Sequence, residues 1–225
     1  MKANTEILSG FYHSVNGFRK TDKKILKTVE RLKIPVYNGR MEKGVNNMIE
    51  AIDGFRLPRY AQIPDVGLYL EQVVRYVNTH LAPLGEPELT SSMVSNYVKQ
   101  GLISSPIKKS YTAEHLSRLL FIAVVKPVVP LEGLRMMFSI QGDNYSLPTA
   151  YDYFCDEFEN MLGAAFGIAP AREGLGETRS DAKNLLRNTI VATVNKIYLD
   201  RYLKEYQKRR EEASDEGETS AQGIE

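Results

Sequence analysis

Apolar residues recur at helical spacing through most of this 225-residue chain, and this pattern most constrains its fold. The apolar residues of the segment 113–125 are Leu116, Leu119, Leu120, Ala123 and Val124. Because three or four residues separate most of them, they line one face of an α-helix. Alternating strand patterns are almost absent, and at most a two-stranded ribbon is expected over Ile103–Tyr111. The sequence therefore predicts an all-α fold.

Further helices are predicted on both sides of this segment. They span about 22–33, 41–55, 65–80, 131–140, 151–166 and 180–210. An extended segment, Leu57–Pro64, precedes the helix over 65–80, for which Asp65 is the predicted N-cap. Thr112 is the predicted N-cap of the helix over 113–125, with His115 where a capping box usually carries Glu or Gln. The last helix is longer than typical globular helices, so we expect it to pack along the body or against a second copy.

The stretch Leu89–Tyr111 combines a short helix with a basic loop. Thr90 is a suitable N-cap, and Gly101 is a suitable stop. One face of this helix is apolar and includes Tyr97, whose hydroxyl could still reach a phosphate. The opposite face carries Ser91, Ser92, Ser95, Asn96 and Lys99. No acidic residue interrupts the stretch, and such a polar helix face followed by lysines is typical of a nucleic-acid reader.

Several motifs in this region resemble the winged helix-turn-helix of MerR-type regulators. The residues concerned are Tyr97-Val98-Lys99-Gln100-Gly101-Leu102, Lys109-Ser110-Tyr111-Thr112 and Pro130-Leu131-Glu132-Gly133-Leu134. The phrases IPDVGLYLEQVVRYVN, LTSSMVSNYVKQGLI and KKSYTAEHLSRLLFI are similar to an uncharacterised bacterial domain family of unknown function. That family is regarded as a MerR-like DNA-binding domain, and the resemblance covers about Gly44–Ile140.

The resemblance implies a transcriptional regulator that binds double-stranded DNA. Its recognition helix would be Thr90–Gln100 and its short basic wing Lys108–Tyr111. The expected contact residues are Ser91, Ser92, Ser95, Asn96, Tyr97, Lys99, Lys108, Lys109, Ser110 and Tyr111. Asparagine pairs well with adenine, and lysine with phosphate or guanine. The alternative interpretation is that these residues form an ordinary solvent-exposed helix face with no binding role.

Four regions are expected along the chain. They are an N-terminal arm and helix over 1–40, the MerR-like domain over 41–142, a C-terminal helical region over 143–212 and a disordered acidic tail over 213–225. The C-terminal region would form a homodimer or sense a signal. A near-neutral net charge of +1, a short wing and Ser95 in place of a usual arginine favour an alternative function. In that alternative the chain is a helical protein-interaction module that does not bind DNA.

An enzyme is not expected, because the common phosphate-loop, zinc-protease and nucleophile-elbow motifs are absent. Cys155 is the single cysteine and the three histidines are dispersed, so neither a metal nor another cofactor is predicted. Asp152, Asp156 and Glu159 share a helix face that could bind a cation, although solvated charge is the better interpretation. No apolar run is long enough to span a bilayer, so we expect a cytoplasmic protein.

Overall fold

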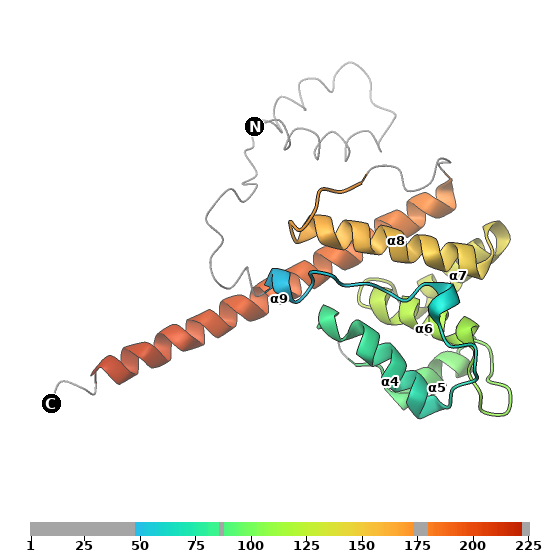
Figure 1. Ribbon diagram of the computed structural model, residues 1–225, viewed down its shortest axis with the longest axis horizontal. Helices are drawn as coiled ribbons and strands as arrows, with labels where there is room; N and C mark the ends of the chain where they lie inside the picture. Colours follow the sequence, from blue (N-terminus) through green and yellow to red (C-terminus); the bar gives the residue numbers. More distant parts are fainter. Residues whose placement is uncertain (1–47, 86–87, 173–179, 222–225) are drawn as a thin grey trace, which may run out of the picture. The chain divides into compact units, whose positions relative to one another are not determined.

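The computed structural model describes residues 48–85, 88–172 and 180–221, with side chains described as far as residue 212. These residues lie in one compact unit that spans Lys43–Glu225. Its elements are the 3-10 turns η1 (Tyr60–Gln62) and η2 (Ala82–Leu84) and the helices α4 (Leu70–Leu81), α5 (Ser91–Lys99), α6 (Ala113–Val125), α7 (Leu131–Asn144), α8 (Leu147–Ala165) and α9 (Asp181–Ala221) (Figure 1). The described part of the chain is therefore all-helical, as predicted. The arm and the helix expected over 1–40 lie outside these residues.

The central helix of the fold is α6, which packs against α4, α8 and α9. Side chains on almost every side of α6 are buried, including Leu116, Leu119, Leu120, Ile122 and Val124. A helix that is apolar nearly all round needs neighbours on several sides. The other helices supply them, and the bounds predicted for the segment 113–125 are confirmed.

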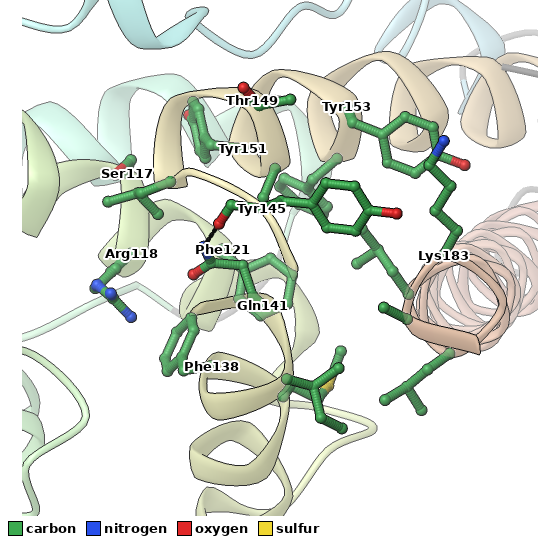
Figure 2. A pocket seen from close by; sticks show the side chains of 18 residues that line it. Ser117, Arg118, Phe121, Phe138, Gln141, Tyr145, Thr149, Tyr151, Tyr153 and Lys183 are labelled. Carbon is green, nitrogen blue, oxygen red and sulfur yellow. Dashed lines mark hydrogen bonds between the residues drawn. The ribbon is translucent and has the colours of Figure 1, made fainter. Parts of the chain in front are cut away.

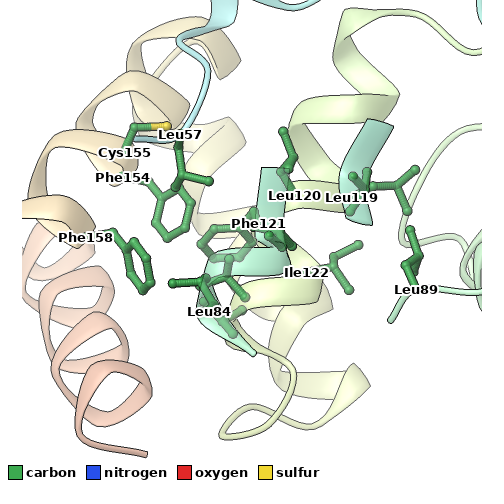
Figure 3. Close-up of a cluster of buried hydrophobic side chains, with 14 of the residues drawn as sticks. Leu57, Leu84, Leu89, Leu119, Leu120, Phe121, Ile122, Phe154, Cys155 and Phe158 are labelled. Carbon is green, nitrogen blue, oxygen red and sulfur yellow. The ribbon is translucent and has the colours of Figure 1, made fainter. Parts of the chain in front are cut away.

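Aromatic rings connect α6 to α8 and to the chain before η1. The ring centroids of Phe121 and Phe154 are 4.9 Å apart, and those of Phe154 and Phe158 are 5.7 Å apart. Phe55 meets Phe158 edge to face at 6.2 Å. Figure 3 shows Phe154 and Phe158 pointing from α8 toward Phe121 and Leu84. This cluster forms the part of the core on which α8 rests.

An arginine holds the extended segment before η1 against α8. The guanidinium of Arg59 donates to Asp156 and Glu159, each at 2.7 Å. Glu159 also accepts the backbone N–H of Leu57 at 2.9 Å, while Asp152 accepts the first N–H of η1 at 2.7 Å. The interpretation as solvated charge is wrong for Glu159, whose side chain is 8% exposed and binds Arg59 from 100 residues away. Asp156 also binds Arg59 but stays exposed, while Asp152 accepts a backbone N–H.

The start of α4 differs from the sequence prediction. The helix begins at Leu70 with Tyr69 as its N-cap, not at Asp65. The cause is a contact distant in sequence, because Leu68 forms an antiparallel bridge with Tyr111. Both of their backbone N–H groups donate across this bridge at 2.9 Å, which keeps Leu68 extended.

Other boundaries also shift. Of the helix expected over 41–55, residues 41–47 lie outside the described residues, Met48 to Glu50 are helical, and a turn follows in place of the last predicted residues. The ribbon expected over Ile103–Tyr111 is reduced to an isolated Ile107–Ser110 bridge, together with the bridge to Leu68. Helices α7, α8 and α9 are all longer than predicted, and α8 begins early because Ser146 accepts the N–H of its third residue. No described helix is long and apolar enough to cross a membrane.

Candidate nucleic-acid interface

The start of α5 is fixed by one local and one distant contact. Thr90 caps the helix, as predicted, because its hydroxyl accepts the N–H of Met93 at 3.3 Å. The side chain of Asn78 in α4 bonds to both backbone groups of Leu89, accepting its N–H at 2.8 Å and donating to its carbonyl at 2.9 Å. These bonds set where α5 leaves the surface of α4.

The end of α5 is closed by glycine and by a basic side chain. Gly101 has φ of 69°, which glycine adopts without the steric penalty of a Cβ. The N–H of Leu102 then donates to the carbonyl of Tyr97 at 2.9 Å. Arg135 of α7 donates to the carbonyl of Gln100 at 2.8 Å, satisfying an acceptor at the helix end.

The exposed face of α5 consists of the small polar residues expected from the sequence. Ser92, Ser95, Asn96 and Lys99 are all exposed, and Ser91 is half-buried. The hydroxyl of Ser95 donates to the carbonyl of Ser91 at 2.9 Å, as serines commonly do inside helices. Most side chains on this exposed face are therefore short. Asn96 and Lys99 carry the polar groups that reach furthest from the helix.

The loop after α5 presents two lysines at a tight turn. Lys108 and Lys109 are exposed, and both have positive φ, 50° and 65° respectively. The bridge between Ile107 and Ser110 closes the turn around them. Because a left-handed backbone is unusual for lysine, the turn needs support from elsewhere.

That support comes from the segment before α4. A Cβ added to Gly67 would lie 1.6 Å from the hydroxyl oxygen of Ser110, so only glycine permits this close approach. The Leu68–Tyr111 bridge lies directly beside it. The residues just before α4 therefore pack against the end of the lysine turn and support it.

Two of the predicted contact residues belong to the core. Tyr97 is 1% exposed, and its hydroxyl is buried without a hydrogen-bond partner in the described residues. Tyr111 is also buried and packs edge to face against His115 at 5.3 Å. Neither ring is available to a surface partner in this conformation, so the accessible set contains the serines, Asn96 and the three lysines.

A buried histidine connects the loop to α6. Nδ1 of His115 accepts the backbone N–H of Thr112 at 3.0 Å, so the proton resides on Nε2. Nε2 lies 3.0 Å from the hydroxyl of Ser104, to which it can donate. Burial lowers the pKa of His115, against the opposing field of Glu114. This neutral histidine performs the capping-box role usually filled by Glu or Gln.

The electrostatic surroundings of the interface are mixed. Glu71 of α4 accepts the hydroxyl of Ser91 at 2.9 Å, placing a carboxylate at the N-terminal end of the α5 face. Glu88 is also exposed just before α5. The cations lie toward the opposite end of α5 and on the loop. No cluster of potential metal ligands was found among the described residues.

Three contributors to this surface were missed from the sequence: Asn78, Gly67 and Ile107. Asn78 and Gly67 act through distant partners that no local pattern reveals. Ile107 is 74% exposed at the turn that carries the lysines. A bulky apolar residue flanked by lysines in a predicted loop is a signal that could have indicated it.

The described chain is an all-helical protein whose α5 and adjoining loop form a polar and basic surface. Residues 58–154 match the model of a family described as "Domain of unknown function (DUF1836)". The match confirms the expectation of an uncharacterised domain and includes α4, α5, α6, α7 and the start of α8. Searches among curated proteins and among solved structures found no match.

Proposed function

We propose that the chain binds double-stranded DNA through α5 and the lysine turn that follows it. The observation that carries the proposal is the exposure of Asn96 and Lys99 on a low serine-rich face, next to a turn that exposes Lys108 and Lys109. An α-helix with short side chains fits the major groove closely. The lysines would neutralise phosphates on either side of it.

In this proposal α4 and α5 form a helix-turn-helix, and the loop is the wing. Asn78 fixes the connection between the two helices through Leu89. The Leu68–Tyr111 bridge closes the base of the wing, as one strand pair would in a longer wing. The amide of Asn96 would pair with adenine, while Lys99 would contact phosphate or guanine. The domain would thus act as a MerR-like transcriptional regulator.

The salt dependence of DNA binding tests the wing. We expect the double variant Lys108→Gln/Lys109→Gln to weaken binding to a duplex of mixed sequence, measured by fluorescence anisotropy. The slope of log K against log salt should fall by about 2, because each phosphate contact contributes roughly 0.9. Glutamine retains the length and polarity of the side chain while it removes the charge.

The matched control is Lys204→Gln/Lys208→Gln, which removes two exposed lysines from α9. This variant has the same net charge as the wing variant, so it corrects for long-range attraction. An identical salt slope for the two variants would contradict the wing assignment. Loss of binding restricted to the wing variant would support it.

The proposal includes a homodimer formed through α9. Leu199, Leu203 and Tyr206 are exposed and are spaced by four and three residues, the spacing of a coiled-coil seam. Two copies joined there would read half-sites about one helical turn apart. Light scattering should give a dimer mass at about 50 µM, and Leu199→Glu/Leu203→Glu should give a monomer. A monomeric wild-type chain under these conditions would refute the dimer but not DNA binding.

A second candidate function is supported by exposed apolar residues at the base of the wing. Val66 and Tyr69 are 73% and 63% exposed, and they flank the Gly67 contact with Ser110. Together with Ile107 they favour a protein partner that covers this side. Glu71 beside α5 favours the same alternative.

A pull-down of fragmented genomic DNA, followed by sequencing, separates these two candidates. DNA binding predicts enriched fragments that are lost with Lys108→Gln/Lys109→Gln. The protein-interaction alternative predicts no enriched fragment and a co-purifying protein that is lost with Ile107→Ser. Met136→Ser, on the exposed side of α7 and outside both proposed surfaces, serves as the matched apolar control.

A further inference from the structure

A cavity of about 190 Å³ lies among α6, α7, α8 and the start of α9. The rings of Phe121 and Phe154 line it and are buried in the core. Leu185 of α9 lines it as well and is 40% exposed, so the cavity opens to the surface on that side. Protein interiors contain few voids larger than a water molecule, so an opening of this size beside the aromatic core is unusual.

Aromatic rings make up much of the cavity wall. Figure 2 shows the rings of Phe138, Tyr145 and Tyr153 around it, with the two tyrosines nearer α9. Such rings pack favourably against another ring, edge to face or offset. An engineered protein cavity of about 150 Å³ lined by Leu, Ile and Phe binds benzene. The present cavity is slightly larger, so its size suits one six-membered ring with a short substituent.

Most polar side chains around the cavity are already bonded within the protein. The hydroxyl of Ser117 donates to the carbonyl of Glu114 at 2.9 Å, and the hydroxyls of Tyr145 and Ser180 lie 3.0 Å apart. The amide nitrogen of Gln141 donates to the carbonyl of Tyr145 at 2.7 Å (Figure 2). A ligand therefore gains little from hydrogen-bonding groups of its own.

Two lining residues keep a polar atom without a partner among the described residues. These atoms are Oε1 of Gln141 and the hydroxyl oxygen of Tyr151. Both are fully buried, so neither borders space that a water-sized molecule can enter. They do not anchor a ligand in this conformation.

The two cations that line the cavity are both engaged. Arg118 pairs with Glu114 at 3.5 Å and lies over an aromatic ring of α7 at 4.7 Å. The ammonium of Lys183 lies 5.5 Å from the ring centroid of Tyr153 and 5.9 Å from that of Tyr145. An ionised ligand would lose its hydration in a largely apolar cavity and would compete with these contacts for either cation. The cavity therefore favours an uncharged ligand.

We propose that this cavity binds a small neutral aromatic molecule, with its ring among Phe121, Phe138 and Phe154. The ring buries apolar surface against walls that need no charge or hydrogen bond from it. Because the cavity is distinct from the α5 surface, this site does not rest on the DNA-binding function. A bound ring would contact α7 and α9 together, so it would also stabilise the packing of α9.

The test is a titration of the full chain with ethylbenzene, monitored by NMR of isotope-labelled methionine methyl groups. Met137 lines the cavity, whereas its neighbour Met136 is 61% exposed and does not. We expect the methyl signal of Met137 to shift until the site is saturated, because a bound aromatic ring changes the local magnetic field. The signal of Met136 should stay in place and is the control. Met137→Leu and Met136→Leu identify the two signals.

Two charged analogues of similar shape, phenylacetate and 2-phenylethylammonium, test the preference for an uncharged ligand. We expect both to bind at least about tenfold more weakly than ethylbenzene, because an ion loses its hydration in an apolar cavity. Equal or tighter binding of either ion would overturn the proposal. So would the absence of a Met137 response up to the solubility limit of ethylbenzene, or equal shifts of the two methyl signals.

A variant tests the cavity itself. Ala150 lines the opening from α8, and Ala150→Phe would fill it with a ring of the chain's own. Ala61→Phe makes the same substitution at an exposed position of η1 and is the matched control. Circular dichroism verifies that both variants are folded; Ala150→Phe should then abolish binding of ethylbenzene, and Ala61→Phe should retain it. Unchanged affinity in a folded Ala150→Phe variant would contradict the site. If that variant does not fold, the comparison of ethylbenzene with its charged analogues decides the outcome.

Discussion

Two regions of the molecule differ in the kind of bond that holds their part-buried polar groups. Around α5 and its loop, the part-buried bonds join neutral groups: Asn78 to Leu89, and His115 to Thr112 and Ser104. The bonds of Arg135 and Glu71 to α5 are exposed. Around α8, the corresponding bonds involve charges. Arg59 binds Asp156 and Glu159, and Arg187 of α9 lies 2.9 Å from the buried carboxylate of Glu157.

The two kinds of bond predict that the two regions respond differently to salt. Neutral hydrogen bonds are directional and hardly affected by salt, so they suit a surface whose shape must hold while it meets a polyanion. Ion pairs between distant segments instead join α8 to the chain before η1 and to α9. The region that we propose to bind DNA thus keeps its own charges on the surface, where a partner can reach them.

The largest expected effect concerns the aromatic core beneath the charged region. Phe158 is fully buried and contacts Phe55 and Phe154. We expect Phe158→Ala to lower the free energy of unfolding by about 3–5 kcal/mol, because it removes apolar contacts and leaves a cavity. Guanidinium denaturation measures this loss. Met136→Ala, on the exposed side of α7, is the control and should change stability by less than about 0.5 kcal/mol.

A smaller loss is expected when the charged clamp is broken. Arg59→Met keeps most of the side-chain volume but removes both guanidinium bonds to the largely buried Glu159. The carboxylate then keeps the N–H of Leu57 and the exposed Arg56 at 3.6 Å. We expect a loss of about 2 kcal/mol, because two charge-assisted bonds are lost in a partly buried site. Lys208→Met breaks the exposed pair with Glu212 and should have almost no effect. Equal losses for the two variants would show that the Arg59 clamp behaves as a surface pair.

Sequence reasoning located the features that depend on neighbours in the chain. Thr90, Gly101 and the helix over Ala113–Val125 were predictable because caps, stops and apolar spacing are local signals. His115 was predicted at its capping-box position and lies there. The polar face of α5 was also predictable, since a helix with an apolar side must present its other side to solvent.

Features that depend on distant partners were not predictable. The bridge from Leu68 to Tyr111 delays the start of α4, and no pattern near Asp65 indicates it. Arg59 meets its carboxylates across about 100 residues. Local patterns specify each helix, but they do not specify which side chains meet between helices.

The neutral region should lose less stability than the charged one when a single bond pair is removed. Asn78→Leu preserves volume but abolishes both bonds to the backbone of Leu89. We expect a loss of about 1–2 kcal/mol, because the backbone groups of Leu89 are left unsatisfied. The amide proton of Leu89 should also exchange faster with solvent. Asn188→Leu, whose side chain only bonds within exposed α9, is the matched control.

The smallest effects are on pH dependence, and here the two regions should differ in sign. Burial lowers the pKa of His115 below the 6.5 of an unperturbed histidine. The unfolded chain therefore takes up a proton first, and stability decreases as the pH falls from 6.5 through the folded-state pKa. Glu114 opposes the shift and Arg118 reinforces it. His115→Gln retains an acceptor for the N–H of Thr112 and should remove this decrease, as urea denaturation across pH would show.

Glu157 should behave in the opposite sense. Burial raises its pKa above the unperturbed 4.5, although Arg187, Asn160 and Arg172 counteract the shift. The folded chain holds this proton more tightly, so stability decreases as the pH rises from 4.5 through the folded-state pKa. Between these two reference values the contributions of His115 and Glu157 oppose each other in the wild-type chain. Glu157→Gln should therefore give a curve that rises with pH more steeply than wild type, and His115→Gln one that rises less steeply. If both variants shift the slope in the same direction, the contrast between a neutral and a charged region does not hold.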